Sequence, residues 1–100
     1  MSTFIMLTRL ATGIPRSPEN LEELERSAIQ QIQSVCPNVR WRSSYAVLGR
    51  SDYLDVFEAP DVETAMKVSA LIRTYGHADT EVWPAVEWQR FKEIARSLHA

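Results

Sequence analysis

Asp55 is the residue whose position most invites a chemical interpretation, because it lies inside the apolar stretch formed by residues 53–57. Side chains alternate between the two faces of a strand, so the pattern places Asp55 with the aromatic residues at positions 53 and 57. If that face is buried, the pKa of the carboxyl rises unless a cation or hydrogen-bond donors compensate. Asp55 is then a candidate general base or ligand anchor. Alternatively, it forms a structural ion pair with Arg9 or Arg42.

Arg9 and Glu81 are charged candidates on two other predicted strands. Arg9 could hold an anionic ligand through two parallel hydrogen bonds, or it could pair with Asp55 or Glu81. Glu81 alternates with Asp79 and Trp83, so these three side chains share a face. Asp55 and Glu81 could therefore line one cavity, although the predicted sheet order leaves a strand between them. A solvated or salt-bridged Glu81 is the structural alternative.

His77, Trp83 and Tyr53 complete the set of candidate ligand-binding residues. His77 follows Gly76, which we expect to close a helix in the left-handed conformation, and it could carry protons at a cavity mouth near neutral pH. More often, a histidine in this position caps helix carbonyls. Trp83 and Tyr53 could form an aromatic wall of a cavity, but packing between two copies explains them as well.

Several kinds of site are absent from the sequence. It contains no glycine-rich phosphate loop, no Ser-His-Asp arrangement and no zinc signature. His77 and His99 are too far apart to form a metal site by spacing. Cys36, the single cysteine, precedes Pro37 and is typical of a half-buried structural thiol. We therefore expect no metal and no cofactor.

The composition excludes some classes of protein. The 11 Lys and Arg residues against 13 Asp and Glu give a net charge of −2, which leaves no basic excess for binding nucleic acid. No apolar run approaches the roughly 20 residues needed to cross a bilayer, and the N-terminus lacks the basic segment of a signal peptide. We expect a cytoplasmic protein with one domain over residues 1–100. A chain this short buries only about 60–65% of its unfolded surface, so a second copy would add stability.

The apolar pattern predicts an alternation of strands and helices that ends in a helix. Strands are expected at residues 3–10, 39–48, 53–58 and 79–83. The first helix begins at Ser17 with Pro18 in its first turn, and Pro37 ends it. The second helix follows the cap Asp61 and ends at Gly76. A last amphipathic helix lies near the C-terminus.

This order predicts an α+β fold with a ferredoxin-like βαββαβ sandwich and an extra C-terminal helix. Right-handed crossovers place both long helices on one face of an antiparallel sheet, in the strand order fourth, first, third, second. In the hairpin we expect Leu48 to pair with Tyr53, which puts Asp55 opposite Ala46.

The two faces of the sheet are expected to differ in what covers them. The face away from the helices should carry Asp55 together with large apolar residues, namely Leu48, Tyr53, Phe57 and Trp83. The face toward the helices should carry Trp41, Tyr45, Val47, Leu54 and Val56. So much apolar surface on the first face needs a cover. A second copy of the same sheet is the simplest one, which predicts a homodimer.

Three sequence motifs resemble those of GYD-domain proteins. They are IMLTRL at residues 5–10, YAVLG with DY and FEAPD within residues 45–61, and GHA with TE and WPA within residues 76–85. The resemblance covers nearly the whole chain and implies a ferredoxin-like fold of the dimeric α/β-barrel group, in which two sheets face each other. The family is of uncharacterised function, so the resemblance implies no catalytic residue. Ser51 stands where the family's motif has a tyrosine between its glycine and aspartate, so no role of that tyrosine transfers.

The leading hypothesis for function is a homodimer that binds a small organic molecule in a cavity between its two sheets, without chemistry. The alternative is a cofactor-independent enzyme, a monooxygenase or isomerase, which rests on analogy with other proteins of this fold. A third possibility is a structural partner protein whose barrel is filled by side chains such as Leu48, Phe57 and Trp83.

Overall fold

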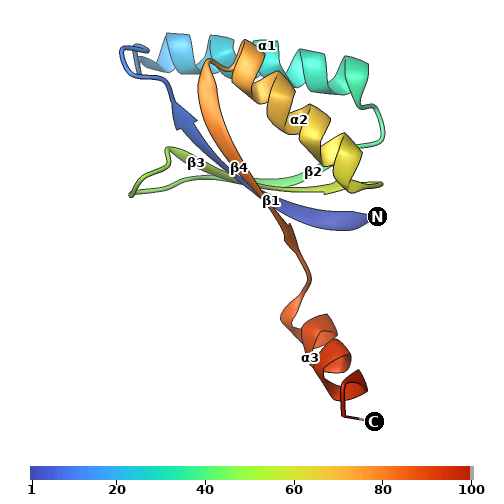
Figure 1. The fold of residues 1–100 in the computed structure, drawn as a ribbon. Helices are drawn as coiled ribbons and strands as arrows, with labels where there is room; N and C mark the ends of the chain where they lie inside the picture. The colour runs from blue at the N-terminus through green and yellow to red at the C-terminus, as the bar shows by residue number, and fades with distance from the viewer. Residues whose placement is uncertain (100) are drawn as a thin grey trace.

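The computed structural model describes residues 1–99, whose elements follow the order βαββαβα (Figure 1). The strands are β1 (Ser2–Leu10), β2 (Arg40–Ala46), β3 (Tyr53–Ala59) and β4 (Ala78–Ala85). The helices are α1 (Pro18–Val35), α2 (Val62–Tyr75) and α3 (Trp88–Ser97). The predicted α+β class and element order are confirmed. β4 continues past Pro84, where the prediction ended it, because an edge strand tolerates a residue without an N–H donor.

Both long helices begin at the predicted caps. The Ser17 side chain accepts a hydrogen bond from the Asn20 backbone N–H at 3.3 Å, and Pro18 follows in the first turn. The Asp61 carboxylate accepts from the Thr64 N–H at 2.7 Å. Each cap satisfies a backbone donor that the first turn of a helix leaves free. The sequence signals therefore fix where α1 and α2 start.

The sheet has the order β2-β3-β1-β4, as predicted, and α1 and α2 lie together over one of its faces (Figure 1). The core lies between these two layers. Met6 and Phe57, from the two central strands, have 0% exposed surface. Phe57 stacks on Phe4 and on Trp41, with ring centroids 5.6 and 5.4 Å apart. Trp41 therefore points toward the helices, as predicted.

The hairpin between β2 and β3 has a different register from the predicted one. Ala46 rather than Leu48 pairs with Tyr53, and Ser44 rather than Ala46 pairs with Asp55. The connection is longer than expected and is closed by a 3.0 Å backbone hydrogen bond between residues 47 and 52. Leu48 consequently lies exposed in the loop. A slip of two residues does not by itself change which face a side chain occupies, because alternate residues share a face.

The predicted orientation of the β3 side chains is wrong. Phe57 pairs with Phe4 and Asp55 pairs with Met6, and both β1 partners are buried under the helices. Asp55, Tyr53 and Phe57 therefore point toward α1 and α2. We call this side of the sheet the helix face.

The other side of the sheet, which we call the open face, carries the residues that alternate with these. Val56 pairs with Ile5 and Leu54 with Leu7, while Tyr45 of β2 pairs with Leu54. The prediction had turned Leu54, Val56 and Tyr45 toward the helices. The physical reason for the error is that both alternating sets of β3 residues are apolar, so alternation does not identify the core side.

Gly76 closes α2, but it does so in the right-handed conformation, with φ −94° and ψ −4°. The left-handed residue is the next one, His77, with φ 50°. Gly76 is required there by space rather than by φ, since a Cβ on it would lie 2.6 Å from the backbone oxygen of Ile72. The predicted left-handed glycine is therefore wrong, and the position still needs a glycine.

α3 lies apart from the sandwich, on the side of the sheet opposite α1 and α2 (Figure 1). None of its residues is buried, and the chain reaches 54 Å in its longest dimension. Residues 86 and 87 alone connect α3 to β4. Across residues 1–99, no helix combines the length and the apolar character that crossing a membrane requires.

Candidate functional site

The open face has an apolar centre that nothing in residues 1–99 covers. Its four central side chains come from β1 and β3 and are only half-buried although these are the inner strands: Ile5, Leu7, Leu54 and Val56. Two aromatic side chains widen it, Trp83 on β4 with 47% exposed surface and Tyr45 on β2 with 57%. In soluble proteins, large exposed apolar surfaces often belong to interaction or ligand-binding sites.

Charged side chains surround this apolar centre. Arg42 donates from Nη2 to Glu58 Oε1 at 2.6 Å across the β2–β3 pair. Arg9 stands in register with Asp79, and Glu81 stands in register with the central Leu7. Of the candidate ligand-binding residues, the structure therefore brings three to the open face, namely Arg9, Glu81 and Trp83.

Asp55 occupies a half-buried position on the helix face rather than on the open face. The Trp41 indole Nε1 donates to Asp55 Oδ1 at 3.3 Å and to Ser44 Oγ at 2.8 Å. Burial raises the pKa of Asp55, although hydrogen bonds from Ser44 and Trp41 oppose the shift. The nearby charge of Glu25 on α1 also raises it. The carboxyl is thus held beneath a helix by neutral donors.

The alternative of an ion pair between Asp55 and Arg9 or Arg42 is wrong. Arg42 is engaged with Glu58 on the open face, and Arg9 projects from β1 on that same face. The sheet itself separates both guanidinium groups from Asp55. The correction has the same cause as the wrong orientation of β3, because Asp55 lies on the opposite face of the sheet from both arginines.

Tyr53 and Thr8 continue this polar strip along the helix face, where they pair across β3 and β1. Burial, and then the charge of Asp52, raise the pKa of the Tyr53 hydroxyl. The Thr8 hydroxyl is buried and has no hydrogen-bond partner in the described part of the chain. On its other side Thr8 pairs with Thr80, whose hydroxyl already bonds Ser69 and Arg73. Tyr53 is therefore not beside Trp83, as an aromatic wall would require.

His77 lies in the turn between α2 and β4, exposed to solvent. Its carbonyl accepts from the Ala11 N–H at 2.9 Å, which ties this turn to the end of β1. Four residues of β1 lie between Ala11 and Met6, the residue opposite Asp55. His77 therefore does not share a site with Asp55, and its geometry is that of a connection between chain segments.

Asp52 has a structural role that the sequence reading missed. Its carboxylate Oδ2 accepts from the Leu10 N–H at 2.8 Å and from Arg16 at 3.3 Å. The Leu10 hydrogen bond is the main cause that lowers the pKa of Asp52, with Arg16 adding to it. An Asp at the end of a hairpin loop was the available signal. This contact joins the β2–β3 loop to the end of β1.

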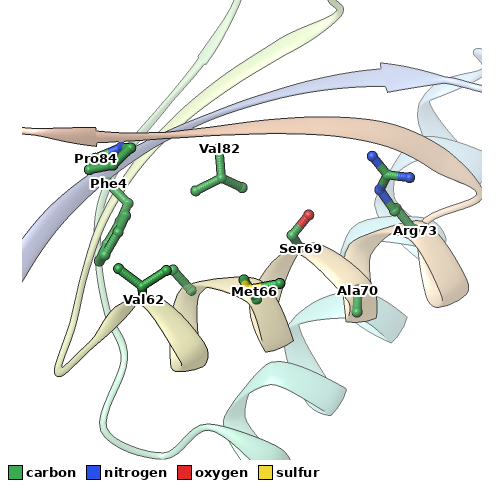
Figure 2. A pocket seen from close by; sticks show the side chains of 9 residues that line it. Phe4, Val62, Met66, Ser69, Ala70, Arg73, Val82 and Pro84 are labelled. Carbon is green, nitrogen blue, oxygen red and sulfur yellow. The ribbon is translucent and has the colours of Figure 1, made fainter.

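A shallow apolar groove lies on the outer side of α2, along the edge strand β4 (Figure 2). Its volume is about 360 Å³. Phe4, Val62 and Pro84 lie at one end of the groove and Arg73 at the other, with Met66 on its α2 wall (Figure 2). No candidate residue from the sequence lines it. Among residues 1–99, no group of three potential metal ligands is present either.

The arrangement limits the chemistry that either face can perform. A ligand on the open face meets aliphatic and aromatic side chains, the Glu81 carboxylate beside the centre, and the Arg9 guanidinium with Asp79 opposite it. That set can hold an apolar molecule and orient an anionic or hydroxyl group on it. Glu81 is the carboxylate nearest the apolar centre, because it stands in register with Leu7, whereas Asp55 is on the far side of the sheet.

Solved structures show which fold this chain shares. Muconolactone isomerase matches with a TM-score of 0.56 and 18% identity, over 85% of this chain and 88% of the other. SCO4226 from Streptomyces coelicolor A3(2) matches with a TM-score of 0.54 and 16% identity, over 84% and 96%. At3g17210 from Arabidopsis thaliana matches with a TM-score of 0.55 and 15% identity, over 87% of this chain and 95% of the other. At such low identity these similarities establish the ferredoxin-like fold and nothing about activity.

The comparison with curated proteins gives no match. The family model of the GYD domain, in contrast, matches residues 4–95. This range begins in β1 and runs into α3, so it includes every strand of the sheet and both covering helices. The chain belongs to the GYD-domain family.

Proposed function

We propose that this protein is a homodimer whose open faces meet and enclose a cavity that binds a small, largely apolar organic molecule. The observation that carries the proposal is the uncovered apolar centre on the two inner strands, formed by Ile5, Leu7, Leu54 and Val56. Inner strands of a sheet are the best shielded part of a sandwich, so apolar side chains left half-open there require a cover. A second open face is apolar in the same places and matches by symmetry.

The energy of closing the two faces supports this arrangement. Full burial of a Val, Leu or Ile side chain contributes about 1.5–3 kcal/mol relative to exposure. Each of the four central side chains keeps no more than about a third of its surface exposed, so covering them contributes at most about 2–4 kcal/mol per copy. This contribution from two copies offsets part of the entropy lost on association.

The charged residues define the ligand's chemistry within this proposal. Arg9 and Glu81 stand near the apolar centre, while Trp83 offers an aromatic surface beside Ile5. A flat or branched hydrocarbon body fits the centre, and a carboxylate or enolate oxygen fits the Arg9 guanidinium. The rim pair Arg42–Glu58 closes the β2 side without facing the centre.

The enzymatic alternative would use the same cavity. Muconolactone isomerase has this fold, and an isomerase that acts by proton transfer needs a group that moves a proton at a bound carbon. On the open face that group would be Glu81. Incubating the captured molecule with the protein in deuterium oxide separates the two functions. If the captured molecule takes up deuterium with the wild-type protein but not with Glu81→Gln, the protein is an enzyme. If the mass of the captured molecule does not change, the protein only binds it.

Sedimentation and native mass spectrometry test the dimer. Leu54→Asp puts a charge at the centre of the open face, and we expect it to give a monomer at low micromolar concentration. Gln30→Asp makes a comparable change on an exposed position of α1 and should leave the dimer intact. A wild-type protein that sediments as a folded 11.4 kDa monomer contradicts the proposal.

Native mass spectrometry of freshly purified dimer tests the ligand. We expect a mass excess from a small molecule, and we expect Arg9→Gln to lose it while the dimer remains. Arg42→Gln, on the rim, is the matched control and should retain it. A dimer without any bound molecule, whose sheets pack together with no void, would favour the structural partner protein instead.

A further inference from the structure

α3 presents an apolar stripe that has no partner within residues 1–99. Trp88, Phe91, Ile94 and Leu98 recur at helical spacing and expose between 36% and 76% of their surface. Trp88 and Phe91 stack on each other, with ring centroids 5.7 Å apart, so they form one aromatic ridge. The opposite side of the helix carries polar residues such as Gln89 and Glu93. A helix of this kind is stable only when its apolar side is covered.

The groove along α2 is a second apolar surface without a partner. Val62 and Met66 line it and are exposed, while Phe4 and Ala65 form buried parts of its wall (Figure 2). Arg73 at its far end is already bonded to Thr80, through Nε to the hydroxyl and Nη2 to the carbonyl, each at 2.9 Å. The groove therefore offers apolar surface and a flexible methionine, which adapts to an inserted side chain.

These two surfaces are on opposite sides of the sheet in one chain. The groove lies on the side of α1 and α2, and α3 lies on the side of the open face (Figure 1). For α3 to enter its own groove, the two connecting residues would have to reverse the chain and carry the helix around the β4 edge. A second copy placed on the open face, as in the proposed homodimer, removes that requirement, because α3 extends on that side of the sheet.

We propose that α3 of each copy packs its aromatic ridge into the groove between α2 and β4 of a second copy. This inference rests on the proposed homodimer, and the distances agree with it. Facing sheets lie about 10 Å apart and a helix layer adds about 10 Å, so the partner's α2 lies roughly 20 Å from the first sheet. Residues 86–87 in extended form and the ten residues of α3 together span about 22 Å. The two copies then exchange their α3 helices symmetrically, each packing on the other.

Cross-linking between differently marked chains tests where α3 binds. Met66→Cys and Phe91→Cys chains are purified separately, mixed at equal concentration and treated with a short bismaleimide. We expect a covalent dimer that contains one chain of each kind. Thr74→Cys, exposed elsewhere on α2, replaces Met66→Cys as the control and should give at least several-fold less product. The native Cys36 is buried and does not compete.

The double variant with Met66→Cys and Phe91→Cys in one chain distinguishes exchange from folding back. A cross-link that closes within single chains, with no mixed dimer, overturns the proposal in favour of the chain's own groove. No cross-link of either kind in a protein that still sediments as a dimer overturns the proposal and leaves the homodimer intact. A wild-type protein that sediments as a monomer overturns both.

A charge on the ridge provides an independent measurement. Phe91→Asp should raise the dimer dissociation constant by about tenfold or more, since a buried aromatic anchor is lost. Gln89→Asp introduces the same charge on the polar side of α3 and should leave the constant within about twofold. Equal dissociation constants for Phe91→Asp and the wild type overturn the proposal.

Discussion

The two faces of the sheet use similar side chains for different purposes. On the helix face, Met6 and Phe57 have no exposed surface. The same face carries Asp55, whose pKa burial raises and whose carboxylate accepts a hydrogen bond from Trp41. The open face holds aliphatic residues of equal hydrophobicity on the same two strands, yet leaves them half-open. The comparison teaches that apolar residues on both sides of a strand need not share one environment, since within residues 1–99 the helices cover one side only.

The largest expected effect comes from truncating one aromatic residue under the helices. Phe57→Ala removes the ring that Phe4 and Trp41 stack on, and it should lower the free energy of unfolding by about 3–5 kcal/mol. Val56→Ala, one residue away on the open face, should cost well under half of that in the monomer and act mainly on dimer affinity. Denaturant titrations at several protein concentrations measure both. Equal losses for the two variants would show that the faces are not distinct.

Gly76 ends α2, and replacing it should lower the free energy of unfolding by less than Phe57→Ala does. Gly76→Ala places a Cβ 2.6 Å from the Ile72 carbonyl oxygen, and this backbone atom cannot move without opening the last turn of α2. We expect a loss of about 1–3 kcal/mol in urea unfolding.

His77→Gly is the control for the Gly76 variant. It relieves a positive φ but gains entropy in the unfolded chain, so it should stay within about 1 kcal/mol of the wild type. If Gly76→Ala were as stable as the wild type, the steric account of this turn would be wrong.

Replacing Asp55 should have the smallest effect on the free energy of unfolding, and this effect should depend on pH. Burial raises its pKa in the folded protein, so the folded state binds the proton more tightly than the unfolded state. Stability from this group is then present in acid and declines as pH rises from the unfolded pKa through the folded one. Asp55→Asn should remove that decline, so that the variant gains on the wild type between acid and neutral pH.

Urea midpoints of the Asp55→Asn and wild-type proteins, measured across this pH range, test the sign. Ser44→Ala serves as a control, because it removes a hydrogen bond that favours the charged form and should steepen the decline. If the wild type instead becomes more stable relative to Asp55→Asn as the pH rises, groups other than Ser44 and Trp41 stabilise the charged carboxylate in the folded protein.

Much of the fold follows from local signals in the sequence. Ser17 and Asp61 act as helix caps in the structure as their residue types predict, because a capping side chain satisfies donors within its own first turn. The strand order follows from the element order, because crossovers have a fixed hand. The predicted pairing of β2 with β3 differs from the observed one by two residues. The reason is that the loop at residues 47–52 has no turn sequence that fixes its length.

The candidate site was harder to predict, because it depends on the choice between two faces. Trp83, and Glu81 which shares its face, were assigned to the side away from the helices correctly, since alternate residues of a strand point to the same side. Asp55 and Tyr53 were assigned to the wrong face, since Leu54 and Val56 are as apolar as the residues they alternate with. The groove on α2 could not be found at all, because it is made by residues from three separate elements.

The sequence by itself determined the caps, the elements, their order and the presence of one carboxylate in an apolar strand. These properties depend on neighbours within a few residues, or on handedness that every chain shares. Only the tertiary structure decided that Asp55 lies under α1 and α2, that Gly76 is needed for space, and that α3 stands away from its own sheet. These properties depend on which surfaces meet. Burial is a property of the assembled layers, and a pattern that is apolar on both sides leaves that choice to packing.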